Sequence, residues 1–220
     1  MDDAHILSHV DHTLLTAVAS WVEVEQLCAE AIRYKTASVC IPPCYIERIK
    51  LTFPKLNVCT VIGFPLGYDA VTIKAASAQA AVGDGANELD MVINLTDVKN
   101  GEFGAIGTEI GTLKTIAGPC VLKVIVETCY LTESEKIALC RVVTDAGADY
   151  IKTSTGFGTA GATMEDVKLF KEHVGPRVKI KAAGGIRTRE DMVAYLEAGC
   201  SRLGTSSAIK ILAGSTAQGY

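Results

Sequence analysis

The 220-residue sequence predicts a single (β/α)8 TIM barrel that spans residues 1–220. Three times, a helical run ends at a glycine and a short apolar strand follows. These junctions lie at 83–90, 145–152 and 197–204. Three threonines also precede an acidic residue by three positions, which is the spacing of a helix N-cap. They are Thr132, Thr163 and Thr188. Strand, cap, helix and glycine in this order are typical of successive βα units.

Eight segments have the length and apolar content of buried strands. They lie at 10–13, 38–41, 58–63, 88–94, 121–127, 150–154, 178–183 and 202–205. Eight units in a chain of this length fit a compact barrel, and their number disfavours a doubly wound open sheet. The first segment is the least regular, because residues 9–13 could also cap the first helix.

The composition predicts a cytoplasmic protein. A formal net charge of −4 gives no reason to expect nucleic acid or an anionic membrane as a partner. No apolar run approaches the length of a membrane span, and the Met-Asp-Asp start lacks the basic residues of a signal peptide. The eight cysteines include no C-x-x-C pair, so we expect reduced residues in the core.

Charged residues interrupt several of the predicted strands, although buried parallel strands should be almost continuously apolar. The interrupting residues are Asp90, Lys123, Glu127, Lys152, Lys179 and Lys181. The two-residue period places Lys179 with Lys181, and Lys123 with Glu127, on one face. If this face lines the barrel, the charges meet near its axis. Such a group at the C-terminal strand ends indicates a catalytic set more often than a stabilising ion pair.

Lys152 and Lys181 are 29 residues apart, which is one βα unit, so they should be neighbours at the barrel mouth. Two ammonium groups held close together disfavour each other's charge. A neutral lysine amine attacks carbonyl carbons and forms an imine, which accepts electrons when an adjacent C–C bond breaks. Asp90 could move protons between water, lysine and substrate. The pattern therefore predicts aldolase chemistry without a cofactor.

Two glycine-containing loops predict a phosphate site. Gly184 and Gly185 follow the seventh strand, and residues 204–207 end the eighth strand and open a helix. Glycines let backbone N–H groups approach an anion, and these two loops are the usual phosphate site of this barrel.

Two other kinds of site are not expected. Residues 156–161 read G-x-G-x-x-G, but the position at which a dinucleotide site needs an acidic residue is Lys181. His5, His9 and His12 could share a helical face, but His173 is the one remaining histidine. We interpret the three as ordinary polar residues near the N-terminus and predict no metal site.

Five ordered segments resemble the deoxyribose-phosphate aldolase family. They are residues 88–94, 122–127, 152–157, 181–188 and 204–207, and the resemblance runs from Asp11 to the last helix. It implies a class I aldolase of deoxyribonucleoside catabolism that interconverts 2-deoxy-D-ribose 5-phosphate with D-glyceraldehyde 3-phosphate and acetaldehyde. The implied partners are this phosphorylated sugar and short aldehydes, and the chain could form a homo-oligomer.

The resemblance also implies residue roles. Lys152 forms the Schiff base, and Asp90 and Lys181 act as proton donor and acceptor. The implied phosphate ligands are Gly184, Gly185, Gly204, Ser206 and Ser207. Residues that line the substrate or support those that do are Asp11, Thr13, Cys40, Lys123 and Thr155. Some relatives carry a lysine where this chain has Phe157, a change that removes a cation near the phosphate and could loosen the preference for phosphorylated aldehydes.

Two alternatives stay open at this point. One is a lysine-dependent aldolase for another sugar phosphate or a keto acid, and the other is a non-catalytic phosphosugar-binding protein. The tail at 214–220 is equally open. It could be a flexible end, or it could fold over the barrel mouth and bring the hydroxyl of Tyr220 to the reacting atoms.

Overall fold

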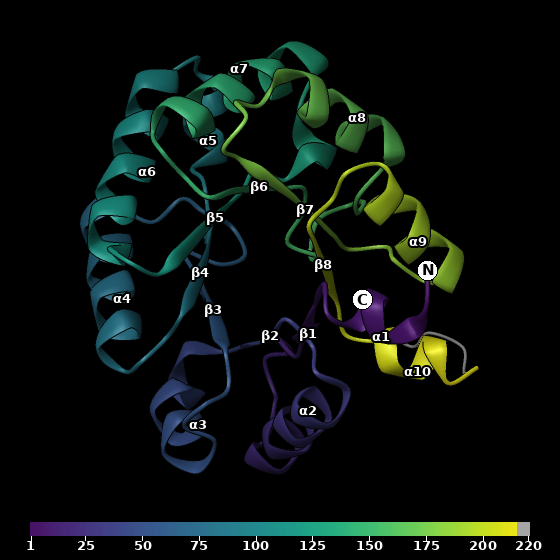
Figure 1. Ribbon diagram of the computed structural model, residues 1–220. Coiled ribbons are helices and arrows are strands. Elements are labelled where there is room, and N and C mark those ends of the chain that lie inside the picture. The colour runs from purple at the N-terminus through teal and green to yellow at the C-terminus, as the bar shows by residue number, and fades with distance from the viewer. Residues whose placement is uncertain (215–220) are drawn as a thin grey trace.

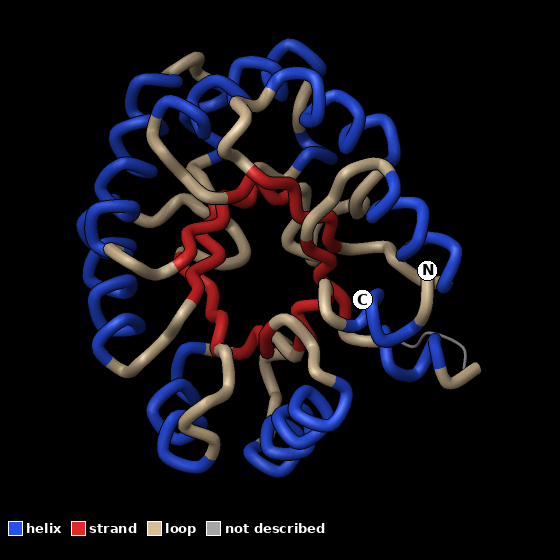
Figure 2. The backbone as a smooth tube through the Cα atoms, viewed as in Figure 1, coloured by secondary structure: helices blue, strands red, loops and turns tan. Residues whose placement is uncertain are grey.

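The computed structural model, which describes residues 1–214, shows a closed barrel of eight parallel strands (Figure 2). The strands are β1 (Val10–Thr13), β2 (Ser38–Ile41), β3 (Val58–Ile62), β4 (Glu88–Val92), β5 (Val121–Ile125), β6 (Tyr150–Lys152), β7 (Lys179–Ala183) and β8 (Arg202–Thr205). They pair in sequence order, and pairing of β8 with β1 closes the ring. The predicted (β/α)8 barrel is confirmed.

Helices surround the ring of strands (Figure 1). They are α1 (Asp3–Leu7), α2 (Trp21–Tyr34), α3 (Ile46–Thr52), α4 (Val71–Gly83), α5 (Leu95–Lys99), α6 (Phe103–Ala117), α7 (Glu133–Asp145), α8 (Met164–His173), α9 (Arg189–Glu197) and α10 (Ala208–Leu212). Short 3-10 turns, η1 (Pro43–Tyr45) and η2 (Thr128–Tyr130), follow β2 and β5. In the described part of the chain, no helix combines the length and the apolar character that crossing a membrane requires.

The predicted helix caps are present, with one difference. Thr132 and Thr188 form complete capping boxes, in which the cap hydroxyl and the acidic side chain each accept a backbone N–H. Thr163 accepts the N–H of Asp166, but the Asp166 carboxylate binds Lys136 at 2.6 Å and does not return to the cap. The threonine pattern therefore located three helix starts correctly and overestimated one cap.

The ends of three strands were predicted correctly. The segments 10–13, 38–41 and 202–205 match β1, β2 and β8, so the first segment is a strand and does not cap a helix. Longer segments overshot because the chain stays buried beyond the last ladder hydrogen bond. β5 ends at Ile125, and Glu127 has a φ of 54°. The expectation that Lys123 and Glu127 share a strand face is therefore wrong.

The barrel separates an apolar layer from a polar interior. Apolar side chains such as Leu89, Ile151 and Phe170 are fully buried in the core cluster formed by strands and helices. Inside the ring, several ionised side chains are buried. Burying charges is unfavourable unless they are paired, so the interior is built for a purpose other than simple packing.

The cysteines partly follow the prediction. All eight are free, and five of them are buried. Cys44 is exposed, which contradicts its assignment to the core. Cys59 is buried, but its Sγ lies 3.2 Å from the Asp90 carboxylate in the polar interior. The apolar run around Cys59 therefore predicted correctly that this residue is buried, but it did not predict that the thiol lies in the polar interior.

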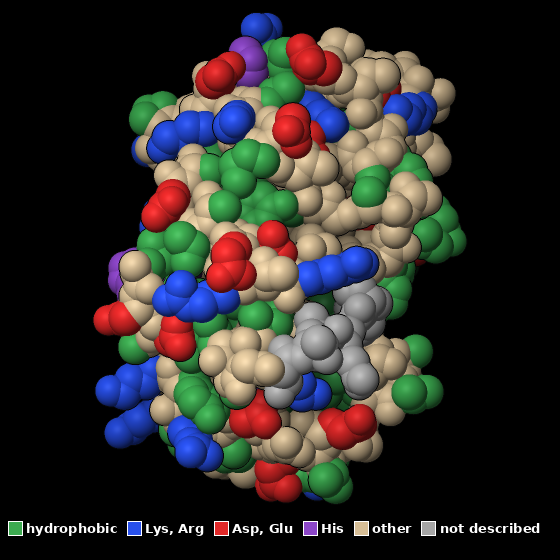
Figure 3. Space-filling model, turned by 90° about the vertical axis from the view of Figure 1, so that its right-hand side faces the viewer, with side chains coloured by type: hydrophobic (Ala, Val, Ile, Leu, Met, Phe, Trp, Pro, Cys, Tyr) green, Lys and Arg blue, Asp and Glu red, His purple; other side chains and the backbone are tan. Residues whose placement is uncertain are grey.

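Figure 3 shows acidic and basic side chains interspersed over one face of the molecule. Neither sign of charge dominates that face, in keeping with the small formal net charge. Residues 215–220, including Tyr220, lie outside the described residues, and so does most of the tail for which a return to the barrel mouth was considered.

The interpretation of His12 as an ordinary polar residue near the N-terminus is wrong. His12 lies in β1, is 3% exposed, and its Nε2 lies 2.9 Å from the Glu30 carboxylate. Its Nδ1 has no hydrogen-bond partner in the described part of the protein. Burial lowers the pKa of His12 below its usual 6.5, while the hydrogen bond to Glu30 opposes this shift.

This shift predicts a pH dependence of stability. As the pH falls through about 6.5, His12 gains a proton in the unfolded chain before it does in the folded one, so the free energy of unfolding decreases. His12→Gln, which can keep a hydrogen bond to Glu30, should flatten this decrease in urea titrations between roughly pH 7 and pH 5. Exposed His173 provides the control, and His173→Gln should keep the wild-type slope. Equal slopes in all three proteins would contradict the assignment.

Candidate active site

A pocket opens where the C-terminal ends of β1, β6, β7 and β8 meet. Its lining includes eight of the residues singled out from the sequence: Thr13, Lys152, Thr155, Gly184, Gly185, Gly204, Ser206 and Ser207. One lysine amine and two glycine-containing loops thus face the same space. Five more of the residues singled out are buried in the barrel: Asp11, Cys40, Asp90, Lys123 and Lys181.

A single carboxylate oxygen joins the two lysines that the sequence placed side by side. Asp90 lies in β4, Lys152 in β6 and Lys181 in β7, with Lys152 paired directly to Lys181 in the sheet register. The Nζ atoms of both lysines lie 2.7 Å from Oδ2 of Asp90. The two nitrogens are therefore no farther apart than twice that distance. A proton can move between the lysines through this oxygen.

The other oxygen of Asp90 faces the opposite side of the barrel. Its Oδ1 accepts a hydrogen bond from Lys123 at 2.9 Å and one from the thiol of Cys59 at 3.2 Å. Lys123 also pairs with Glu88 at 2.5 Å. Asp90 is thus fully buried and has a partner on each oxygen, which fixes its orientation toward Lys152.

Asp11 and Arg202 complete the buried network. Asp11 contacts the Lys181 amine and the Arg202 guanidinium, and its Oδ1 accepts from Ser38 at 2.6 Å. Arg202 also binds the Glu88 carboxylate at 3.0 Å. A ring of alternating charges therefore lies below the pocket, and it holds Lys181 in place.

This network shifts the acid–base behaviour of its members. Burial raises the pKa of Asp90, but Lys123, Lys152 and Lys181 lower it more, so it lies well below its usual value. Burial lowers the pKa of Lys181, but Asp11 and Asp90 raise it more, so it lies above its usual value. Asp90 is therefore an anion and Lys181 a cation throughout the physiological pH range.

The charges in the interior are balanced. The buried carboxylates are those of Asp11, Glu88, Asp90 and Glu127, and the basic groups are those of Lys123, Lys152, Lys181 and Arg202. Full ionisation of these groups would leave no excess charge. Of the four bases, Lys152 has a single carboxylate partner among the ion pairs of the described residues, and it alone lines the pocket.

The loops after β6 and β7 can approach each other closely because glycine has no side chain. A Cβ on Gly161 would lie 2.3 Å from the carbonyl group of Gly184, and Gly184 and Gly185 have φ angles of 78° and 72°. The G-x-G-x-x-G segment therefore brings the loop after β6 against the loop after β7, a role that explains its glycines without a dinucleotide.

Two residues of the site were missed from the sequence. Glu88 and Arg202 belong to the buried ring, although they were noted only as strand residues. Their positions could have indicated this. Glu88 stands two residues before Asp90 and Arg202 two residues before Gly204, and residues two apart in a strand lie on the same face. Glu127 was singled out from the sequence as a charged strand residue, but it lies beyond the end of β5, and its side chain contacts the hydroxyl of Thr155. Burial raises the pKa of Glu127, and hydrogen bonds from Thr155 oppose the shift.

Two residues singled out from the sequence lie away from the pocket wall. Lys179 is exposed, and its Nζ lies 5.7 Å from the centre of the Tyr150 ring, so it does not join Lys181 in the buried network. Phe157 is 46% exposed, and its ring packs edge-on against Phe64 with centroids 5.3 Å apart. Phe157, at the position where some relatives were said to carry a lysine, therefore makes an aromatic contact in this chain.

Potential metal ligands gather at two places in the described chain, and neither includes a histidine. The groups are Cys40, Cys59 and Asp90, and Asp11, Cys59 and Glu88. His5 and His9 lie outside both groups, near the N-terminus, with their ring centroids 4.7 Å apart and the rings tilted at 47° to each other.

Comparison with known proteins agrees with an aldolase built on this barrel. Residues 5–214 match the model of the DeoC/LacD family aldolases. A deoxyribose-phosphate aldolase of Clostridium botulinum (strain Eklund 17B / Type B) is 59% identical over 221 aligned residues that cover 100% of both chains. The enzyme of the same name from Clostridioides difficile (strain 630) is 54% identical and covers 94% of this chain and 95% of its own.

Solved structures give the same result. A putative deoxyribose-phosphate aldolase from Coccidioides immitis superposes with a TM-score of 0.93 at 38% identity, covering 97% of this chain and 87% of that one. A deoxyribose phosphate aldolase from Aeropyrum pernix, described as tetrameric, gives 0.91 at 33% identity and covers 97% and 92%. The fold and the site define an aldolase built on a (β/α)8 barrel. The chain belongs to the DeoC/LacD aldolase family.

Proposed function

We propose that the enzyme reversibly cleaves 2-deoxy-D-ribose 5-phosphate to D-glyceraldehyde 3-phosphate and acetaldehyde, through a Schiff base on Lys152. One observation carries the proposal. The Lys152 amine lies in the pocket and shares a buried carboxylate oxygen with the Lys181 amine. The names of the relatives, including the 59% identical enzyme, support this substrate.

The position of Lys152 supports it as the nucleophile. Of the four basic groups in the interior it alone lines the pocket, and it has a single carboxylate partner, Asp90, among the ion pairs of the described residues. In its neutral form this amine has a lone pair to offer to the aldehyde carbon of the sugar. Asp90 stays an anion and Lys181 a cation beside it. Lys181 therefore has a proton to supply, through Asp90, when the carbonyl oxygen leaves as water.

The cleavage step follows from the protonated imine. A base removes the proton of the C3 hydroxyl, the C2–C3 bond breaks, and its electrons move into the imine to give an enamine and glyceraldehyde 3-phosphate. The enamine then takes a proton at carbon, and water releases acetaldehyde and the free amine. Proton exchange through Asp90 Oδ2, which both lysines contact, serves these steps.

Gly184, Gly185, Gly204, Ser206 and Ser207 bind the phosphate in this proposal. All five line the pocket that also contains Lys152. The α10 helix has only five residues, so the backbone N–H groups and serine hydroxyls of the loops supply the main contacts. Arg187, on the same wall, adds a positive charge.

Trapping of the imine tests the proposal. Incubation with acetaldehyde and borohydride should add two carbons to a single lysine, and peptide mass mapping should place the adduct on Lys152. An adduct on Lys181 would reverse the proposed roles. If the chain is a lysine-dependent aldolase for another substrate, analysis of the products would identify it. If it is a non-catalytic phosphosugar-binding protein, neither an adduct nor turnover would be observed.

A substitution in the phosphate wall should separate binding from chemistry. Ser206→Asp places a carboxylate against the phosphate, so KM for the phosphorylated sugar should rise about 10-fold or more, while KM for deoxyribose changes little. Gly185→Asp should act alike, although its φ of 72° adds backbone strain. Exposed Ser134 offers a matched control, and Ser134→Asp should leave both values unchanged. Equal effects of Ser206→Asp on both substrates would place the phosphate elsewhere.

We propose a cytoplasmic location, which the eight free thiols support because a reducing compartment preserves them. Homo-oligomerisation is also proposed, supported by the relative from Aeropyrum pernix that is described as tetrameric. Light scattering after gel filtration measures the mass of the particle, and a mass of 23.3 kDa would contradict the oligomer.

A further inference from the structure

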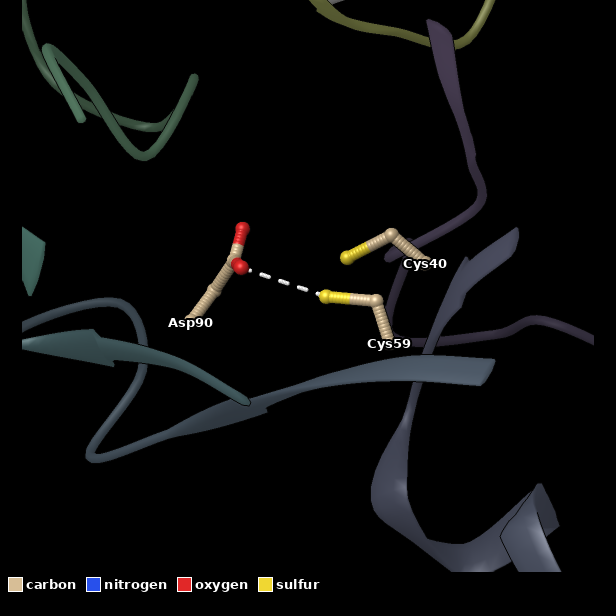
Figure 4. A group of neighbouring side chains, drawn as sticks. All are labelled: Cys40, Cys59 and Asp90. Atoms are coloured by element: carbon tan, nitrogen blue, oxygen red, sulfur yellow. Dashed lines mark hydrogen bonds between the residues drawn. The ribbon is translucent and has the colours of Figure 1, made fainter. Parts of the chain in front are cut away.

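Two thiols and a carboxylate meet on three neighbouring strands inside the barrel. Cys40 in β2 is the direct register partner of Cys59 in β3, and Asp90 follows in β4. Figure 4 shows both sulfur atoms turned toward the carboxylate of Asp90. The two sulfurs and one carboxylate oxygen all lie within 4.8 Å of one another, and all three residues are buried.

The carboxylate of Asp90 can serve this group without losing both lysines of the proposed mechanism. Its Oδ2 faces Lys152 and Lys181, whereas its Oδ1 lies 3.2 Å from the Sγ of Cys59. The competing group at Oδ1 is the amine of Lys123, at 2.9 Å. Lys123 can retain Glu88, at 2.5 Å, when it leaves Oδ1.

We propose that Cys40, Cys59 and Asp90 form a site for a thiophilic divalent cation, Zn²⁺ in particular, and that the bound ion inhibits the enzyme. In a tetrahedral zinc site with Zn–S of about 2.3 Å and Zn–O of about 2.0 Å, neighbouring ligand atoms lie about 3.5–3.8 Å apart. The distance of 3.2 Å between Cys59 Sγ and Asp90 Oδ1 is close to this separation of neighbouring ligand atoms. Water occupies the fourth position.

The site takes up the ion without a change in net charge. Two neutral thiols release two protons as the metal binds, so a cation of charge +2 replaces two protons in a network that is already balanced. A hydrogen bond from Cys59 lowers the pKa of the Cys40 thiol, whereas burial raises the pKa of the Cys59 thiol, so the metal has to displace the proton of Cys59. Two sulfur ligands select zinc over magnesium or calcium, which prefer oxygen.

The second candidate group is a poorer site. It consists of Asp11, Cys59 and Glu88 and so offers one sulfur. Arg202 contacts both carboxylates of that group. A guanidinium does not deprotonate in proteins, so an incoming cation would meet a fixed positive charge there.

The metal reaches the thiols past a small apolar cap. Cys40 and Cys59 are 1% and 0% exposed beneath Leu15, Val61 and Phe64, which form a cluster separate from the main core. Leu15 also borders the pocket that contains Lys152. Leu15 is therefore the side chain that the thiol cluster and the pocket share.

Inhibition rests on the proposed function, whereas binding does not. A carboxylate that coordinates zinc through Oδ1 is a weaker base at Oδ2, so Asp90 no longer passes protons between the lysines. The test therefore measures binding and rate separately.

Binding is measured with cobalt and by mass. Titration with Co²⁺ alone should give a near-ultraviolet sulfur-to-cobalt charge-transfer band that saturates at one equivalent. Native mass spectrometry with Zn²⁺ should show a gain of one zinc less two protons. The band should be lost in Cys40→Ser and in Cys59→Ser and kept in Cys44→Ser, whose thiol is exposed. The mass measurement uses the unmodified chain, so it stands even if a variant fails to fold.

The rate is measured in the same samples, each relative to its own metal-free value. One equivalent of Zn²⁺ should lower wild-type turnover roughly 10-fold or more, and each thiol variant should need a concentration at least about 10-fold higher for the same loss. EDTA should restore the inhibited enzyme and leave the untreated one unchanged. Absence of the cobalt band, or its persistence in both thiol variants, would overturn the site. A band without loss of rate would overturn the inhibition and count against the role of Asp90.

Discussion

Lys152→Ala should abolish turnover while the barrel stays folded. The imine nitrogen is lost, so the reaction loses its electron acceptor and the rate should fall by about 10⁴-fold or more. Asp90 keeps Lys123 and Lys181 as partners, so the buried carboxylate is not left unpaired. Steady-state assays measure the rate, and far-ultraviolet circular dichroism checks the fold.

Lys179→Ala is the matched control for this substitution. Lys179 lies in β7 but is exposed, and it contacts the Tyr150 ring instead of Asp90. Its variant should keep nearly wild-type turnover. Residual activity of Lys152→Ala above a few per cent of wild type, with borohydride still trapping a substrate carbon, would mean that another amine forms the imine.

Lys181→Met should produce the second largest loss, about 10²–10⁴-fold in kcat. The change removes the cation that shares Oδ2 of Asp90 with Lys152, so proton transfer through this oxygen loses one of its two lysine partners. The pH dependence of kcat/KM should therefore change as well. Borohydride should still trap acetaldehyde on Lys152, but more slowly.

Lys181→Met also leaves Asp11 with fewer partners, and loss of a buried ion pair destabilises a fold by about 3–5 kcal/mol. Rates are therefore compared well below the melting temperature of the variant. Lys179→Met provides the control for the same chemical change in the same strand. An unchanged pH profile together with an unchanged rate would show that the two lysines are not coupled.

The sequence predicted the barrel because its signals are local. Thr132 and Thr188 define helix starts through contacts within four residues, and apolar runs define buried strands. Strand ends were less certain, as β5 shows. Glu127 follows an apolar run without a break, and only the backbone turn at this residue ends the ladder.

The site was predictable where one strand carries its own signal. Asp90, Lys152 and Lys181 are charges in buried strands, and the period of two orients them inward. Distances across the barrel were not predictable, because they depend on how the strands stagger when the ring closes. The shared Oδ2 of Asp90 and the approach of Cys59 to Oδ1 are of this kind.

A positive charge formed on Lys152 couples the two ends of the substrate. Conversion of a neutral Lys152 amine into a protonated imine adds one positive charge to the barrel interior. A phosphate in the same pocket is drawn to that charge. Reciprocity of binding then requires inorganic phosphate to promote imine formation by acetaldehyde by the same factor by which the imine tightens phosphate binding. An acceptor aldehyde without a phosphate does not promote imine formation in this way. We therefore expect less of the enzyme to be present as the imine with such an acceptor, and so a slower reaction.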